Sequence, residues 1–275
     1  MLDRVGIIAN TRARLGYSGL VPIMDEIHTR GWHETRVFYC LPDSVSKLSH
    51  DLIELVMGRE VQVLFVYGGD GTLHKVIDIL IYEQDRNNIT TIPPIVTLGG
   101  GTQKSLFQWL GWGKGFFFHE PPLKIFRRVM LSSLEHLPRR KMRPLSITFH
   151  NTRKGRVETH YGFIFIMGAM ARVIQLYDVD GKSPLSGLKH IGLGMSGSLL
   201  GVPRSHASLV GQFQANQWAD DVLLPRRDPL VVVCSVTDSL LFGIKPFRGL
   251  TESNQFYAGS YAIPASVLSA LVPVE

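Results

Sequence analysis

The strongest constraint on the fold is an alternation of short apolar runs with longer amphipathic segments over the first hundred residues. The apolar runs are VGIIA at 5–9, TRVFYC at 35–40, VQVLFVY at 61–67 and PPIVTL at 93–98, and segments with helical periodicity lie near 18–30, 44–57 and 72–83. This order is typical of a parallel sheet with helices on both faces. A ligand of such a sheet binds at the carboxyl ends of the strands.

The pattern changes after residue 140. The following segments are rich in β-branched and aromatic residues separated by Gly, Pro and Asn: PLSITFH, RVETHYGFIFIMG, PLVVVCSV and SNQFYAGSYAIP. Such segments predict a mostly antiparallel sheet. We therefore predict two domains, an α/β domain at 1–140 and a mostly antiparallel β domain at 141–275.

Composition narrows the class of protein further. The chain has 275 residues, 45% hydrophobic and 19% charged, which is a globular composition. Its two cysteines, Cys40 and Cys234, lie in apolar stretches and predict buried reduced thiols, which favours a reducing cytoplasm. We see neither a signal-peptide core nor an apolar run of the roughly 20 residues that span a bilayer. We expect a cytoplasmic protein, with peripheral membrane binding left open.

The most informative motif is a glycine loop between a strand and a helix. The apolar run at 61–67 leads into Gly68-Gly69-Asp70-Gly71-Thr72 and then into an amphipathic helix. Glycines let backbone N–H groups approach phosphate oxygens, and a helix amino terminus adds about half a positive charge. A carboxylate in such a loop repels phosphate unless a cation lies between them or the carboxylate takes a proton from a hydroxyl. The motif therefore predicts Mg²⁺-assisted phosphoryl transfer, with Thr72 as the helix cap.

A second loop repeats this layout. The run at 93–98 leads into Gly99-Gly100-Gly101-Thr102 and then into a segment with helical spacing. Two glycine loops at adjacent strand ends could hold one nucleotide from two sides. The central hypothesis is that both loops face the same triphosphate and divalent ion.

These residues resemble the catalytic domain of diacylglycerol kinases. That superfamily also includes sphingosine, ceramide and bacterial lipid kinases and, more remotely, NAD kinases. Its nucleotide loop reads GGDGT-x-x-E-V and its second loop P-x-GTGND, and the similarity spans nearly the whole chain. The resemblance implies a Rossmann-like nucleotide-binding domain with a parallel sheet, followed by a mostly antiparallel β-sandwich domain for the lipid substrate.

The resemblance also implies a set of site residues. It implies transfer of the γ-phosphate of ATP to a lipid hydroxyl, with Mg²⁺ as the metal and Asp70 as catalytic residue, either metal ligand or proton acceptor. The residues implied to bind the nucleotide are those of the two loops and their neighbours: Asn10, Gly68, Gly69, Gly71, Thr72, His74, Gly99, Gly100, Gly101 and Thr102.

Several positions depart from the family pattern. The Glu of the first loop is Lys75, the Asn and Asp of the second loop fall at Lys104 and Ser105, and the Pro before the second loop is Gly99. Fewer acidic groups weaken a metal network, although Lys75 and Lys104 could contact phosphates directly. These departures keep open a catalytically weak or inactive relative that binds nucleotide or lipid for regulation. An NAD kinase-like enzyme is a further alternative.

Two surface features suggest partners but have ordinary explanations too. Positive charge gathers at Arg127-Arg128 and at residues 139–143, where a solvated surface competes with binding to anionic lipid headgroups. An aromatic segment, WLGWGKGFFFHEPP at 109–122, could be core or could enter a membrane interface. No motif supports binding to nucleic acid. The oligomeric state stays open, with a homodimer as one alternative.

Overall fold

The computed structural model divides the chain into two compact units, Met1–Gly162 and Phe163–Glu275, which are described separately. The residues it describes are 2–11, 17–32, 36–100, 106, 113–114, 118–132, 134–137, 139–151, 155–179, 218–219, 222–223, 231–237 and 257–261.

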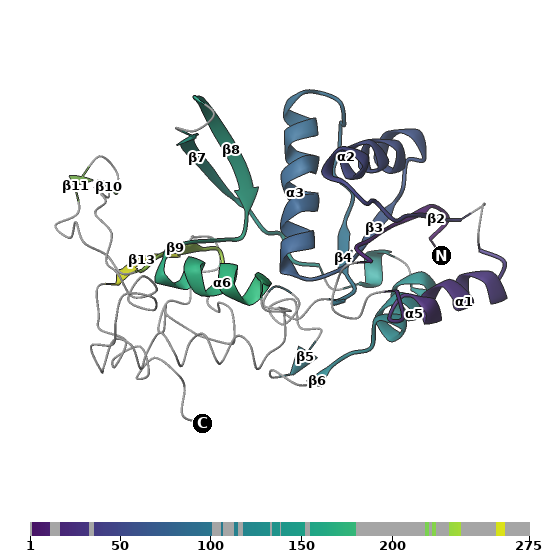
Figure 1. Cartoon of the computed structure of the whole chain (residues 1–275). Coiled ribbons are helices and arrows are strands. Elements are labelled where there is room, and N and C mark those ends of the chain that lie inside the picture. Colours follow the sequence, from purple (N-terminus) through teal and green to yellow (C-terminus); the bar gives the residue numbers. More distant parts are fainter. Residues whose placement is uncertain are drawn as a thin grey trace. The chain divides into compact units, whose positions relative to one another are not determined.

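The first unit is built on the expected parallel sheet (Figure 1). Its strands are β1 (Val5–Ala9), β2 (Val37–Cys40), β3 (Val63–Tyr67) and β4 (Ile95–Thr97), in the order β2-β1-β3-β4 with every pairing parallel. Every residue of β1 and β3 is buried. All four predicted apolar runs thus form strands of one sheet.

Helices cover both faces of this sheet (Figure 1). The helices are α1 (Val21–Thr29), α2 (Val45–Ile53), α3 (Asp70–Asp85) and α5 (Pro122–Leu131), and a π-helical turn at Glu54–Gly58 continues α2. The core between the sheet and helices α1 and α5 contains Phe126, whose ring lies 5.2 Å from that of Phe65 and 6.3 Å from that of Trp32. A 3₁₀ turn follows at Leu134–His136.

Two short antiparallel pairs complete the first unit. Strands β5 (Gly113–Lys114) and β6 (Phe118–His119) pair with each other, as do β7 (Leu145–Asn151) and β8 (Arg156–Gly162). The β7–β8 hairpin belongs to the unit that holds the parallel sheet, and β8 packs on α3. The two compact units therefore divide after residue 162. The domain boundary near residue 140 stays a prediction.

The second unit has the antiparallel character that its composition predicts. Strand β12 (Val231–Ser235) pairs antiparallel with both β9 (Ile164–Gly168) and β13 (Tyr257–Tyr261), and β10 (Trp218–Ala219) pairs with β11 (Val222–Leu223). Helix α6 (Ala169–Val179) follows β9 and was not foreseen from the sequence. The segment RVETHYGFIFIMG forms two strands, β8 and β9, with a break at Phe163.

Within the part of the chain that the structure describes, no helix is both long and apolar enough to cross a membrane. Cys40 and Cys234 are free, but both are half-buried rather than fully buried as predicted. Burial raises the pKa of the Cys40 thiol to about 11, so this thiol stays protonated and unreactive at neutral pH.

Candidate functional site

The candidate site lies where the strand order reverses. In the order β2-β1-β3-β4, the chain leaves β1 toward β2 on one side, while β3 lies on the other side. The carboxyl ends of β1 and β3 therefore flank the switch point at which doubly wound sheets bind ligands. Asn10 follows β1 and Gly68 follows β3, so both reach this point.

A hydrogen bond joins these two strand ends. The backbone N–H of Asn10 donates to the carbonyl oxygen of Tyr67 at 2.9 Å, and its side-chain amide donates to Thr72 Oγ1, also at 2.9 Å. Asn10 therefore lies against the first glycine loop, as the family resemblance implies. The contact explains why an amide donor fits at the end of β1.

Helix α3 begins two residues earlier than the sequence suggests. Gly69 is its N-cap and Asp70 its first residue, and the amide of Thr72 donates to the Gly69 carbonyl at 3.0 Å. The expectation that Thr72 caps the helix was wrong, because Thr72 lies within the first turn and its hydroxyl accepts from Asn10 instead. The loop itself is thus reduced to Gly68 and Gly69.

The glycines around this loop have different reasons to lack a side chain. A Cβ on Gly68 would lie 2.5 Å from Thr72 Oγ1, so the folded protein itself requires glycine there. A Cβ on Gly71 would meet no described atom within 4 Å. Glycine costs a helix about 1 kcal/mol relative to alanine, and among the described residues no atom occupies the place of a methyl group at Gly71. Open space at the start of a helix suits an approaching anion.

Asp70 connects the first loop to the chain that follows the second. Its side chain is largely buried, at 7% exposure, in the first turn of α3, where the helix dipole favours a carboxylate. The backbone amide of Leu106 donates to Asp70 Oδ1 over a long 3.4 Å. One carboxylate oxygen thus helps to hold the second loop region beside the first.

The start of the second loop also lies against the first. The amide of Leu98 donates to the Val66 carbonyl at 2.9 Å, Gly99 has a left-handed φ of +59°, and Gly100 packs on the ring of Tyr67. The described start of the second loop, Gly99-Gly100, therefore lies beside the end of β3 and the first loop. A triphosphate site shared by both loops stays a prediction. Gly101, Thr102, Lys104 and Ser105 fall outside the described residues, as does half of the aromatic segment at 109–122.

His74 lies on the other side of the helix start, against the hairpin. A Cβ built on Gly162 of β8 would lie 3.8 Å from His74 Nδ1. Burial lowers the pKa of His74 to about 4, so the imidazole is neutral at physiological pH. A neutral ring offers no charge to a phosphate. Its assignment to the nucleotide site stays a prediction.

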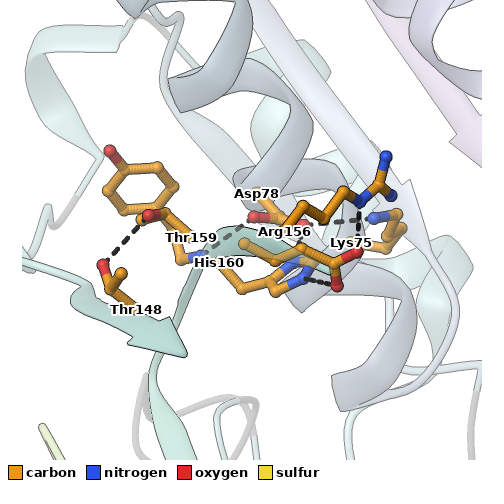
Figure 2. A network of polar contacts seen from close by, with 8 residues as sticks. Lys75, Asp78, Thr148, Arg156, Thr159 and His160 are labelled. Carbon is orange, nitrogen blue, oxygen red and sulfur yellow. Dashed lines mark hydrogen bonds and ion pairs between the residues drawn. The ribbon is translucent and has the colours of Figure 1, made fainter. Parts of the chain in front are cut away.

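Lys75 belongs to a polar network that fastens the hairpin to α3 (Figure 2). Its ammonium group lies 3.1 Å from Asp78 Oδ2, which also contacts His160 Nδ1 at 3.1 Å. The backbone amide of Tyr161 donates to Asp78 Oδ1 at 2.9 Å, and the Tyr161 hydroxyl donates to Asp85 at 2.8 Å. The charge of Lys75 is thus compensated by Asp78, which gives no support to a direct phosphate contact.

The pKa of Asp78 reflects two opposing effects. Desolvation alone would raise it, but the hydrogen bonds from the Tyr161 amide, His160 and Lys75 outweigh burial and lower the pKa below its ordinary value. Asp78 is therefore ionised at neutral pH and binds donors from both α3 and β8. No signal in the sequence distinguishes Asp78 from other acidic residues on exposed helix faces.

The basic residues on α5 have acidic partners. Arg127 Nη2 lies 2.6 Å from Glu26 Oε2, which joins α5 to α1, and Arg128 pairs with Glu120. Hydrogen bonds from Arg127 and Arg30 lower the pKa of Glu26 against the effect of burial. These ion pairs reduce the net positive charge at this surface, and binding to anionic lipid stays a prediction.

Asp70 is the candidate metal ligand among the described residues of this site. Among the described residues, no group of three or more His, Cys, Asp or Glu side chains could hold a metal ion. Mg²⁺ commonly takes one or two carboxylates together with substrate phosphates and water. Asp70, beside the open space at Gly71, fits that arrangement as a single protein ligand.

Fold and site together define a doubly wound α/β protein with one glycine loop at its switch point and the start of a second at the end of the adjacent strand β4, an arrangement suited to a phosphate-bearing ligand. Residues 40–132 match the family model of the diacylglycerol kinase catalytic domain, which confirms the resemblance seen in the motifs. The matched region contains both glycine loops.

Two solved structures share the fold over nearly the whole chain. Both come from Bacillus anthracis str. Sterne and are provisionally assigned as diacylglycerol kinases. One has a TM-score of 0.57 at 14% identity, covering 98% of this chain and 78% of that one, and the other has a TM-score of 0.54 at 16% identity, covering 97% and 78%. At this level of identity the similarity establishes the fold.

Proposed function

We propose that the protein is an ATP-dependent lipid kinase, which transfers the γ-phosphate to a hydroxyl of a lipid such as diacylglycerol, a sphingoid base or ceramide. The observation that carries the proposal is that the start of the second glycine loop lies beside the first, since Gly100 packs on Tyr67 at the end of β3 and the Leu106 amide donates to Asp70. The family match over residues 40–132 supports the same reaction class.

The described residues can perform three tasks in such a reaction. Backbone amides at the start of α3 can bind phosphate oxygens in the space left by Gly71, and Asn10 orders the loop through Thr72. Asp70 can bind the divalent ion or accept the proton of the lipid hydroxyl. When bound, Mg²⁺ would neutralise charge on the phosphates. Catalysis of phosphoryl transfer depends mainly on such positioning and charge placement.

Calorimetric titration of the purified full chain with Mg·ATP tests the first half of the proposal. Transfer of radiolabelled γ-phosphate to diacylglycerol, sphingosine and ceramide in mixed micelles tests the second. Label in one lipid class would identify the acceptor. The exposed Asp25 of α1 provides a matched control, because Asp25→Ala removes a carboxylate from the surface of another helix. A wild-type protein that binds no Mg·ATP would overturn the proposal.

A catalytically weak or inactive relative that binds nucleotide or lipid for regulation is the second candidate. It is favoured by Lys75, which replaces the acidic residue of the family motif and is paired with Asp78. Binding of Mg·ATP without label transfer to any of the three lipids would support it. Label in NAD, added as a fourth acceptor, would instead support the NAD kinase-like alternative.

The proposal includes two kinds of partner, an anionic membrane surface and a second copy of the chain in a homodimer. A lipid acceptor requires access to a bilayer or micelle, and the basic residues at 139–143 are exposed candidates for anionic headgroups. Sedimentation with vesicles of phosphatidylcholine, with and without phosphatidylserine, tests this contact. Absence of binding to both vesicle types would remove it.

A further inference from the structure

The second glycine loop rests on the side chain of Tyr67. Tyr67 is the last residue of β3 and is fully buried, at 0% exposure. An ideal Cβ on Gly100 would lie 2.8 Å from Tyr67 Cζ, 2.9 Å from Cε1 and 3.1 Å from Cε2. Real Cβ atoms do not approach other atoms within 3.0 Å, so the Gly100 backbone lies directly on the outer half of the ring.

The position of this ring is set by the sheet. Tyr67 pairs with Ala9 in the parallel register of β1 and β3, and its carbonyl oxygen accepts from Asn10 at 2.9 Å. The ring belongs to the core cluster that also contains Leu98. A side chain enclosed in a close-packed core cannot move aside without cost. The loop therefore adjusts to the ring rather than the ring to the loop.

Gly99 gives the loop a path that fits over this ring. Its φ of +59° is left-handed, whereas the family motif has Pro at this position, and the proline ring holds φ near −65°. The second loop of this chain therefore enters along a path that the family residue cannot adopt. Gly100 thus leaves room for the Tyr67 ring, and Gly99 supplies the left-handed backbone angle directly before it.

We infer that Tyr67 is a positioning residue for the second glycine loop. It sets the height of the loop above the sheet and hence the separation of the two loops that would hold the nucleotide phosphates. Tyr67 itself contacts no phosphate in this arrangement. The inference rests on the proposed function, because it assigns to a core side chain a role in the geometry of nucleotide binding.

The test is a double-mutant cycle between Tyr67 and Gly100. Gly100→Ala places a methyl group against the ring and should lower the Tm and weaken Mg·ATP binding by on the order of tenfold, because small displacements of binding groups are costly. Tyr67→Leu removes the ring atoms that the methyl would meet. The double variant should bind Mg·ATP more tightly than Gly100→Ala alone and recover most of the lost Tm.

A non-cognate pair provides the control. A Cβ on Gly68 meets Thr72 and not Tyr67, so Tyr67→Leu should leave the defects of Gly68→Ala uncorrected. Equal recovery of both glycine variants would indicate a general effect and would overturn the inference.

Other outcomes separate this inference from the proposed function. If the wild-type protein binds Mg·ATP and the effects of the two substitutions are additive, the positioning role of Tyr67 is overturned and the proposed function still stands. Recovery of the Tm without recovery of the dissociation constant would make Tyr67 a packing residue only, and would also overturn the inference. Absence of Mg·ATP binding by the wild-type chain would overturn the proposed function, while coupling in the Tm would still report the steric contact.

Discussion

The two glycine loops look alike in sequence but are built differently. The first leads directly into α3, with Asp70 in the first helical turn and Gly68 enclosed by Thr72. The second begins with a left-handed residue, Gly99, and passes over Tyr67. Glycine thus has three different settings here: close packing at Gly68 and Gly100, a left-handed backbone angle at Gly99, and open space at Gly71. The predictions below test these settings in order of expected effect.

Loss of the Asp70 carboxylate should have the largest effect. The second loop motif has no acidic residue that corresponds to Asp70. Asp70→Ala should reduce phosphate transfer to background, a loss of at least about a hundredfold as for other groups that stabilise charge in a transition state. Asp70→Asn should do the same while keeping an acceptor for the Leu106 amide, so its Tm should stay close to that of the wild type. The measurements are radiolabel transfer and thermal unfolding. Near-normal turnover of either variant would refute the role of Asp70.

Substitutions of Gly99 test the backbone angle of the second loop. Gly99→Pro should cost about 3 kcal/mol or more in the free energy of unfolding, because proline cannot adopt a positive φ. Gly99→Asn should cost no more than about 1 kcal/mol, since asparagine tolerates the left-handed region. Urea denaturation measures both. If the proline variant were the more stable of the two, this loop would follow the path of the family motif.

Alanine at Gly68 and at Gly71 should change stability in opposite directions. Gly68→Ala should destabilise the protein by about 1 to 3 kcal/mol through overpacking against Thr72. Gly71→Ala should leave stability unchanged or raise it by about 0.5 to 1 kcal/mol, because alanine is the better helix former. The same variant should nevertheless weaken Mg·ATP binding in calorimetry. Unchanged binding would mean that the space at Gly71 is not used by the nucleotide.

Helix α3, which follows the first loop, is also joined to the β7–β8 hairpin through Asp78. This contact predicts a smaller, pH-dependent contribution to the free energy of unfolding. The pKa of Asp78 is lowered in the folded protein. Asp78 therefore contributes fully to stability at pH values above the ordinary aspartate pKa, and this contribution is lost as the pH falls through the lowered pKa of the folded state. Wild-type stability should therefore decline on acidification below about pH 4.

Asp78→Asn should be less stable than the wild type at pH 7 by about 1 to 3 kcal/mol, the usual worth of hydrogen bonds to a charged group, and should show a weaker decline on acidification. Urea denaturation at pH 7 and at acidic pH would show this. Asp25→Asn, on an exposed part of α1, is the control. Parallel pH profiles for wild type and Asp78→Asn would contradict the role of Asp78.

Much of the first unit could be predicted because its signals are local. Apolar runs of four to seven residues separated by helical periodicity identify β1 to β4 and the helices between them, and the glycine motifs identify the ends of β3 and β4. The start of α3 was placed at 72 rather than 70 because glycine and aspartate read as loop residues, although the helix dipole favours an acid in the first turn. The sheet content of the second unit followed from composition, while helix α6 did not.

The roles of individual side chains were harder to foresee. The sequence suggested that Lys75 could contact phosphate, and it gave no sign that Asp78 was important. The residues of β8 that hydrogen-bond to Asp78 lie 82 and 83 positions away in the sequence. The contact between Tyr67 and Gly100 likewise depends on how two strands lie in the sheet. Hydrophobic periodicity reports which face of an element is buried but not which distant residue meets it.

The amino-acid sequence by itself determined the order of strands and helices, the antiparallel character of the carboxyl-terminal half and the two glycine loops, because each of these depends on neighbouring residues. Only the tertiary structure decided which glycines the protein needs for its own packing and which one leaves space for a ligand. It also decided that the hairpin at 145–162 packs with the parallel sheet unit. The physical reason is that steric exclusion and ion pairing act between atoms that only folding brings together.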